Sequence, residues 1–326
     1  MTKELVLEQL WQNADRYVSG TELARRLQLS RSAVWKAIEQ LRVEGYRIES
    51  VTNRGYRLSS RSDVLSVEGL RRCLRHRDIE PRVYKSISST NTVLKDLANQ
   101  GAAEGLALIA GEQTAGRGRM GRSFYSPADT GVYMSLLLRP ERSAVEATRL
   151  TACAAVAAAQ AIEMLSGRET QIKWVNDILI DGRKVCGILS EASIDCESGQ
   201  MRYVIVGIGI NTRLPAADFP AELRDTAGAV FLQARPPELR CRLAAAVLDG
   251  LMDLYKQPQD ETCFTEYKKR SLVLGQPVLL LSPGKDAMPA TVLDLERDYA
   301  LRVRYEDGSI HRVNAGEVSL RQQLHT

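Results

Sequence analysis

The chain has 326 residues, and at roughly 100–200 residues per domain this length predicts two or three domains. Hydrophobic residues make up 44% and charged residues 26%, a globular composition that excludes disordered, collagen-like and disulfide-scaffold classes. The six cysteines form no C-x-x-C pair, and none of the three histidines has a ligand-like partner at helical spacing. These patterns argue against a zinc site and a histidine-based triad. No secretory signal or membrane-spanning apolar run is visible, so we expect a cytoplasmic protein without membrane contact.

The positive charge is concentrated at the N-terminal end. Residues 1–61 contain 11 lysines and arginines against 7 acids, whereas the rest of the chain has 33 of each. A basic excess confined to one end indicates contact with nucleic acid by that end alone.

Two short helices joined by a tight turn are predicted at this end, after a first helix around residues 5–11. Thr21 is a plausible N-cap of the first of the two, and Ser30 caps the second. In the second helix Val34, Ile38 and Leu41 recur at helical spacing, which leaves a polar and basic face outside. This arrangement matches a helix-turn-helix.

A β-hairpin signal follows, with alternating residues 45–49 and 55–58 on either side of a turn at 52–55. A helix-turn-helix followed by a hairpin is the winged type. In this interpretation the DNA contacts are Arg31, Ser32 and Lys36 on the second helix and Arg54 at the tip of the hairpin. The alternative is a small helical module that binds protein. Specific binding to DNA would need a dimer, because one module reads a short site.

The central region begins with hydroxyl and amide side chains at the start of a predicted helix. Ser89, Thr90 and Asn91 precede apolar residues at helical spacing, and Thr90 or Asn91 could cap that helix. Such a helix start also suits a small polar ligand, because unpaired backbone N–H groups point there. Taken alone, capping is the stronger interpretation.

A glycine- and arginine-rich loop follows a buried strand predicted at 106–110. Residues 116–121 formally match G-x-G-x-x-G, but what comes next does not open a helix, so we reject a dinucleotide-binding loop. The glycines let the backbone approach a ligand, and the arginines supply permanent charge for carboxylate or phosphate. Because Arg117, Arg119 and Arg122 repel one another, we expect this loop to be disordered until an anion gathers it.

Further strands are predicted at 131–138, 172–180, 184–191 and 203–210, with an alanine-rich helix over about 147–165. Lys184 enters a buried strand and therefore needs an anionic partner. Gly207 and Gly209 would let another group pack closely against the last strand. The residues gathered in this way are Ser89, Gln113, Arg117, Arg119, Asn176, Asp177, Lys184 and Asn211.

This set is rich in cations and amides and contains no activated nucleophile. It could neutralise a carboxylate and a phosphate brought together, as attack of a carboxylate on the α-phosphate of ATP requires. No G-x-x-x-x-G-K-[ST] loop is present, which argues against the γ-phosphate chemistry of that class.

The motifs resemble those of biotin–protein ligases. The matching segments are Ser89-Thr90-Asn91, the loop 116–122, the run 173–177, Lys184 with 187–189, and 207–211, followed by a tail at 274–278 and 316–321. With the N-terminal winged helix, the chain resembles the bifunctional type, in which a biotin–[acetyl-CoA-carboxylase] ligase is also a biotin-operon repressor. Val175 departs from the family, which usually has proline there.

The resemblance implies a multidomain α+β fold. Its parts would be a winged helix-turn-helix over 1–62, a class II synthetase-like ligase domain over 63–270, and an SH3-like β-barrel over 271–326, where turns at 283–284 and 307–308 also fit short strands. The activity implied is formation of biotinyl-5′-AMP from biotin and MgATP, then transfer to a lysine of a biotin carboxyl carrier protein. The adenylate-bound form would dimerise and bind operator DNA.

The resemblance also implies residue roles. Biotin would be surrounded by Ser89, Thr90, Asn91, Gln113, Arg117, Gly118, Arg119 and Lys184, with Arg119 and Lys184 nearest the reacting groups. The nucleotide would be served by Arg122, Asn176, Asp177 and Asn211, with Asp177 a contact of Mg²⁺. Two alternatives stay open: a regulator that only senses biotin, and a lipoate or octanoyl transferase.

Overall fold

The computed structural model describes residues 2–59, 62–140, 145–195, 200–232, 238–281, 287–314 and 316–320. The chain divides into two compact units. One comprises the described residues of 1–73 and 234–242, and the other those of 74–233 and 243–326. None of the described helices combines the length and the apolar character that a membrane span needs.

The first unit starts with three helices and a hairpin. The helices are α1 (Thr2–Gln12), α2 (Gly20–Leu27) and α3 (Arg31–Val43), and the hairpin strands are β1 (Ile48–Val51) and β2 (Gly55–Leu58). Ser30 caps α3, as predicted, by accepting a hydrogen bond from the backbone N–H of Ala33. The cap of α2 is Ser19 and not Thr21, because the Ser19 hydroxyl accepts from the N–H of Glu22 and the helix begins two residues earlier than predicted.

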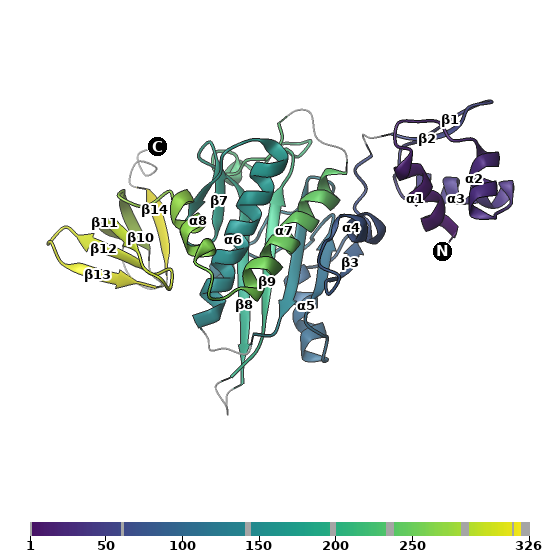
Figure 1. Ribbon diagram of the computed structural model, residues 1–326. Coiled ribbons are helices and arrows are strands. Elements are labelled where there is room, and N and C mark those ends of the chain that lie inside the picture. Colours follow the sequence, from purple (N-terminus) through teal and green to yellow (C-terminus); the bar gives the residue numbers. More distant parts are fainter. Residues whose placement is uncertain are drawn as a thin grey trace. The chain divides into compact units, whose positions relative to one another are not determined.

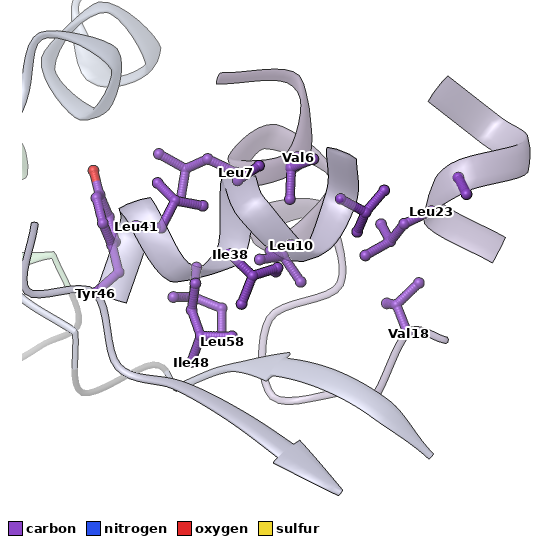
Figure 2. Packing of buried hydrophobic residues seen from close by; sticks show 13 residues of the cluster. Val6, Leu7, Leu10, Val18, Leu23, Ile38, Leu41, Tyr46, Ile48 and Leu58 are labelled. Carbon is purple, nitrogen blue, oxygen red and sulfur yellow. The ribbon is translucent and has the colours of Figure 1, made fainter. Parts of the chain in front are cut away.

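One apolar core holds these elements together (Figure 2). It takes Leu7 and Leu10 from α1, Leu23 from α2, and the predicted row Val34, Ile38 and Leu41 from α3, all fully buried. Ile48 and Leu58 from the two strands close it from below the helices in this view. Helix α4 (Val67–Cys73) completes the unit together with the first turn of α7 (Leu239–Lys256).

The second unit is built on a mixed sheet of seven strands (Figure 1). In sheet order the strands are β3 (Glu80–Tyr84), β4 (Leu106–Ala110), β5 (Gly131–Leu138), β9 (Met201–Asn211), β8 (Arg183–Ile194), β7 (Asp177–Ile180) and β6 (Gln171–Lys173). The predicted strand 172–180 is thus two strands, β6 and β7, joined by a turn. The peptide bond between Trp174 and Val175 in that turn is cis.

Helices cover both faces of this sheet, because successive strand residues point to opposite sides. Odd-numbered residues of β9, such as Tyr203 and Ile205, pack with α5 (Thr90–Asn99). Ser190 of β8 pairs with an even-numbered residue of β9, and its hydroxyl contacts Thr151 of the alanine-rich helix α6 (Val145–Ser166). The α5 face is therefore the face that carries the glycines at 207 and 209.

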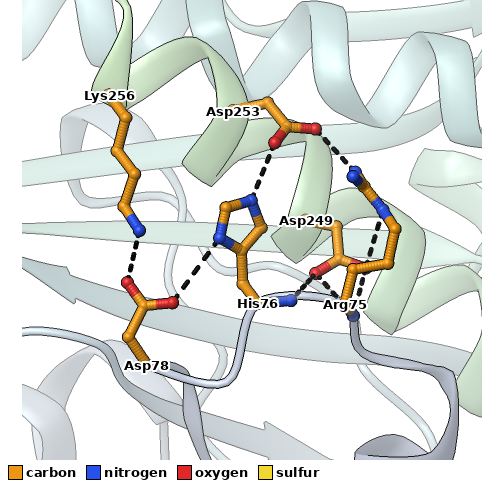
Figure 3. Close-up of polar contacts among 6 residues, drawn as sticks. All are labelled: Arg75, His76, Asp78, Asp249, Asp253 and Lys256. Carbon is orange, nitrogen blue, oxygen red and sulfur yellow. Dashed lines mark hydrogen bonds and ion pairs between the residues drawn. The ribbon is translucent and has the colours of Figure 1, made fainter.

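A row of charged side chains on α7 fixes the segment that leads into β3 (Figure 3). Asp249, Asp253 and Lys256 recur at helical spacing and so lie on one face of α7. The Asp249 carboxylate accepts the backbone N–H groups of Arg75 and His76 at 2.9–3.1 Å. Asp253 lies 2.7 Å from the His76 ring. Although burial opposes it, hydrogen bonding from Arg75 and His76 brings the pKa of Asp253 below its ordinary value.

The C-terminal sheet has five strands in the order β13 (Ile310–Val313), β12 (Leu301–Tyr305), β11 (Met288–Leu295), β10 (Pro277–Leu281) and β14 (Glu317–Leu320). It follows helix α8 (Thr262–Arg270). The predicted turn at 307–308 joins β12 and β13, whereas the one at 283–284 lies outside the described residues. Among the described strands, β13 and β14 are the two edges of this sheet, so the strand pairing does not confirm the predicted SH3-like barrel.

An ion-pair cluster joins α8 to α6. Arg270 contacts the Glu163 carboxylate at 2.7 Å, and the Thr170 hydroxyl contacts the same group at 2.6 Å. Burial alone would raise the pKa of Glu163, but the hydrogen bonds from Arg270 and Thr170 outweigh it and lower that pKa.

Replacing Arg270 with methionine is expected to lower the free energy of unfolding by about 2 kcal/mol at pH 7, because a partly buried charged hydrogen bond is lost. A carboxyl group whose pKa is lower in the folded than in the unfolded state contributes its full stabilisation above the unfolded-state pKa. This contribution is lost as the pH falls through the folded-state pKa. The difference between wild type and Arg270→Met, measured by urea unfolding, should therefore shrink toward acid pH. Arg297→Met, which removes an exposed pair with Glu261, is the control. A pH-independent difference would contradict the assignment.

Candidate functional site

A pocket opens on the α5 face of the large sheet, bounded by the start of α5, the loop 111–127 and strands β5, β8 and β9. All eight residues predicted to surround biotin line it, together with Asn176. The rest of the wall is largely apolar or bare backbone, formed by Phe124, Met134, Gly187, Ile188, Leu189, Gly207, Ile208 and Gly209.

The start of α5 forms the polar wall of the pocket. Ser89 is the N-cap, and its hydroxyl accepts a hydrogen bond from the N–H of Thr92, so the predicted caps Thr90 and Asn91 are wrong. Both instead lie inside the helix and are buried. The backbone N–H and the hydroxyl of Thr90 point to the Gln113 side-chain oxygen at 2.9 and 3.1 Å.

Asn91 occupies the space that Gly207 leaves free. A Cβ at position 207 would lie 2.0 Å from the Asn91 Oδ1 atom. Asn91 Nδ2 donates to the carbonyl of Leu189 at 3.1 Å, and its Oδ1 lies 2.6 Å from the Ser135 hydroxyl. The prediction that a group packs closely against these glycines is confirmed. The second such group is the Phe124 ring, against which a Cβ at position 209 would lie at 2.5 Å.

The arginine-rich loop is folded, contrary to the expectation that charge repulsion keeps it disordered. Its backbone turns back on itself: the Gly118 N–H donates to the carbonyl of Arg122, and the Phe124 N–H to that of Gly116. Each arginine has an acceptor of its own, and for Arg117 and Arg122 it is a carboxylate, which offsets the repulsion. Arg117 pairs with Glu191, Arg119 bonds to Asn176 and to the carbonyl of Gly316, and Arg122 pairs with Glu317.

Lys184 has an anionic partner, as predicted for a lysine that enters a buried strand. Its Nζ lies 2.7 Å from the Asp177 carboxylate on the neighbouring strand β7. The side chain retains 37% of its surface exposed and lines the pocket, so its charge faces both Asp177 and any bound ligand. Cys186, two residues on, is fully buried. Burial raises the pKa of the Cys186 thiol, which keeps it protonated and unsuited to be a nucleophile.

The four residues predicted for the nucleotide are not all brought together. Asn176 lines the pocket, and Asp177 adjoins it through Lys184. Arg122 points to Glu317 with 67% of its side chain exposed. Asn211, at the end of β9, is buried and donates to the carbonyl of Gly228.

The chain offers few ligands for a metal ion. Within the part of the chain that the structure describes, no three His, Cys, Asp or Glu side chains gather to hold one. Asp177 could contribute a carboxylate, and it already faces Lys184. Since Mg²⁺ in nucleotide sites is commonly held by one or two carboxylates plus phosphates, this set fits Mg²⁺ only when it arrives with a nucleotide.

The predicted DNA contacts are all exposed in the first unit. Arg31, Ser32 and Lys36 are exposed on α3, opposite its buried row. Arg54 is exposed in the turn between β1 and β2, and its guanidinium stacks on the Tyr17 ring at 4.4 Å. Arg57 lies 4.8 Å from the same ring. Tyr17 thus holds two cations beside the hairpin.

Three families match this chain, in the order of its elements. They are an HTH domain over residues 2–57, the Biotin/lipoate A/B protein ligase family over 83–211, and the Biotin protein ligase C terminal domain over 273–321. The bifunctional ligase/repressor BirA of Bacillus spizizenii is 44% identical over 229 residues, which cover 70% of each chain. The chain belongs to the bifunctional ligase/repressor BirA family.

Other relatives agree with this family. The bifunctional ligase/repressor BirA of Escherichia coli is 29% identical over 307 residues, covering 93% of this chain and 92% of that one. The biotin protein ligase of Aquifex aeolicus, solved in complex with biotin and ATP, is similar with a TM-score of 0.60 and 26% identity, covering 74% of this chain and 98% of that one. The protein is a biotin ligase.

Several residues that line or support this ligase's pocket were missed from the sequence. Phe124 and Met134 read as ordinary core residues. Ser135 carried a usable signal, since it is a polar side chain within an otherwise apolar strand, and Glu191 follows the apolar run 185–189 of β8. The contacts of Gly316 and Glu317 with the arginine loop had no sequence signal, because they join segments about 195 residues apart.

Proposed function

We propose that this ligase activates biotin with ATP to biotinyl-5′-AMP and transfers the biotinyl group to a lysine of a biotin carboxyl carrier protein. The observation that carries this proposal is the pairing, in one pocket, of a buried polar wall at the start of α5 with the two cations Arg119 and Lys184. The wall suits a neutral polar ring, and the cations suit a carboxylate and a phosphate.

The chemistry needs charge neutralisation more than covalent help from the protein. A biotin carboxylate oxygen bonds to the α-phosphorus of ATP, and the bond to the pyrophosphate oxygen breaks. The carrier's ε-amine then attacks the acyl carbon, loses a proton and displaces AMP. In the first step negative charge collects where Lys184 and Arg119 are placed, so fixed cations stabilise the transition state.

Residue roles follow from this chemistry. Ser89, Thr90 and Gln113 are proposed to contact biotin, with Asn91, Arg117 and Gly118 around it. Asn176 and Asp177 are proposed to bind the nucleotide. Mg²⁺ would arrive on the phosphates of the nucleotide, and Asp177 would be the protein ligand of the metal ion. Arg122 and Asn211 would serve the nucleotide from outside the pocket. Asn176 also holds Arg119, at 3.0 Å, which supports this arrangement.

We further propose that the ligase is a biotin-responsive repressor, which binds operator DNA through α3 and through the β1–β2 hairpin acting as a wing. The proposed domains span residues 1–62, 63–270 and 271–326, and the central one has a class II synthetase-like fold. The exposed cations on α3 and the hairpin support this interpretation. Because one such module reads a short site, the operator-binding form would be a dimer, formed with the adenylate bound. A cytoplasmic location is part of the same proposal.

The test of the enzymatic proposal is biotin-dependent exchange of labelled pyrophosphate into ATP, with lipoate as the control acid. Exchange with biotin and not with lipoate is expected. Biotin binding without exchange would favour a regulator that only senses biotin, and exchange with lipoate would favour the transferase alternative.

Replacing Lys36 with alanine is expected to weaken binding to a non-specific duplex severalfold and to reduce the slope of log K against log salt by about 1, because one phosphate contact is lost. Fluorescence anisotropy across a salt series measures both. Lys3→Ala removes a lysine of the same unit that is paired with Glu44, and it should change neither. Equal effects of the two variants would count against the α3 surface.

A further inference from the structure

Glu191 joins two elements of the biotin pocket without lining it. Its carboxylate accepts a hydrogen bond from Asn91 Nδ2 at 2.8 Å and pairs with the Arg117 guanidinium at 3.0 and 3.2 Å. Asn91 belongs to α5 and Arg117 to the arginine-rich loop, whereas Glu191 belongs to β8. One carboxylate therefore connects a helix, a strand and a loop.

The Asn91 side chain is committed to the protein on both sides of its amide. Nδ2 donates to Leu189 and Glu191, and Oδ1 lies beside Ser135 above the bare backbone of Gly207. With 4% of its surface exposed, Asn91 builds the wall rather than reaching out from it. Glu191 is the nearer of the two acceptors of Nδ2, so it helps to fix the orientation of the amide.

The side chain of Arg117 is also held by a contact within the protein. Its guanidinium turns to Glu191, while the backbone around it lines the pocket. An ion pair that is nearly half exposed stabilises a rigid structure little. Arg117, however, stands between Gly116 and Gly118, and a glycine-rich segment loses much backbone freedom when it is held in one place. The pair with Glu191 ties this segment to β8.

Charge supports the same conclusion. A lone carboxylate beside a pocket for an anionic adenylate would repel the ligand. Because Glu191 is paired with Arg117, the pair has no net charge beside the pocket. Glu191 can therefore hold the loop in place without repelling the anionic ligand. Arg119 and Lys184 remain the cations that face the reacting groups.

We propose that Glu191 is a positioning residue that holds the arginine-rich loop closed over the pocket and orients Asn91. It sets how long biotin and biotinyl-5′-AMP stay bound, and it leaves the rate of adenylation nearly unchanged. This inference rests on the function proposed above.

The test compares wild type and Glu191→Gln in the full chain. Glutamine keeps an acceptor for Asn91 but removes the charge that holds Arg117. Adenylate is formed with biotin and MgATP, the complex is isolated, and its release is followed in a chase with excess unlabelled biotin. We expect release about tenfold faster and a KM for biotin several times higher, because the glycine-flanked segment is no longer tied to β8, with kcat for pyrophosphate exchange within about twofold.

Three comparisons make the test specific. Glu104→Gln, at a carboxylate bonded to Arg139 and Tyr255, is the matched control and should behave as wild type. Arg117→Met should speed release as Glu191→Gln does, and the double variant should add little, because both remove the same pair. Thermal unfolding of each variant separates this role from a loss of fold.

The outcomes are distinguishable. No biotin-dependent exchange by the wild type would overturn the proposed function and this role with it. Normal exchange with wild-type release from Glu191→Gln would overturn the role of Glu191 alone. A fall in kcat as large as the rise in release would also overturn it, because Glu191 would then act on the chemical step.

Discussion

Replacing Lys184 with alanine is expected to lower kcat/KM for biotin-dependent pyrophosphate exchange at least about a hundredfold. In the proposed mechanism the lost ammonium group is a fixed cation where carboxylate and phosphate charges meet, and removing one such group commonly costs two to three orders of magnitude. Asp177, 2.7 Å away, would also be left without its cation and would add repulsion toward the nucleotide.

Arg183→Ala is the matched control for this variant. Arg183 is the preceding residue on β8, is exposed, and donates to the carbonyl of Arg224 instead of facing the pocket. It should retain exchange within about twofold, the scatter of an ordinary surface substitution. If Lys184→Ala exchanged as fast as Arg183→Ala, the assignment of Lys184 to the reacting groups would be wrong.

Replacing Gly207 with alanine is expected to raise the KM for biotin about tenfold or more and to lower the free energy of unfolding by about 1–3 kcal/mol, the usual cost of overpacking. The added Cβ would lie 2.0 Å from Asn91 Oδ1, so Asn91 has to leave its place. Its contacts with Ser135, Leu189 and Glu191 would be lost together. Biotin titrations of the exchange reaction and urea unfolding measure the two effects.

A double-mutant cycle shows whether Asn91 is the cause. In Asn91→Ala the atom that collides with the new Cβ is absent, so adding Gly207→Ala to that variant should cost little more. Strictly additive effects would mean that the alanine disturbs β9 by another route.

Features that depend on one segment of sequence could be predicted. The row Val34, Ile38 and Leu41 is buried, and Ser30 caps its helix, since both follow from helical spacing and a local hydroxyl. Lys184 has a carboxylate partner because a charged group on a buried strand requires one.

Features that depend on strand register or on contacts between distant segments could not be predicted from the sequence. The segment 172–180 carries two apolar runs, and only the turn at 174–176 decides that they form β6 and β7. Asn91 and Glu191 meet because β8, β9 and α5 share one face of the sheet, which no local pattern encodes. The separate acceptors of Arg117, Arg119 and Arg122 had the same origin, so the sequence alone pointed to a repelling, disordered loop.

The Phe124 ring has a consequence for engineering the pocket. It packs on the bare backbone of Gly187 and Gly209, and the structure places it outside the hydrogen-bonded chain that runs from Gln113 to Arg117. The polar residues of the pocket cannot be changed one at a time, because each one is the hydrogen-bond partner of the next. The apolar side chains do not depend on one another through hydrogen bonds. A smaller side chain at position 124 would enlarge the cavity while leaving that network in place, which makes Phe124 the entry point for redesigning the ligase toward bulkier carboxylic acids.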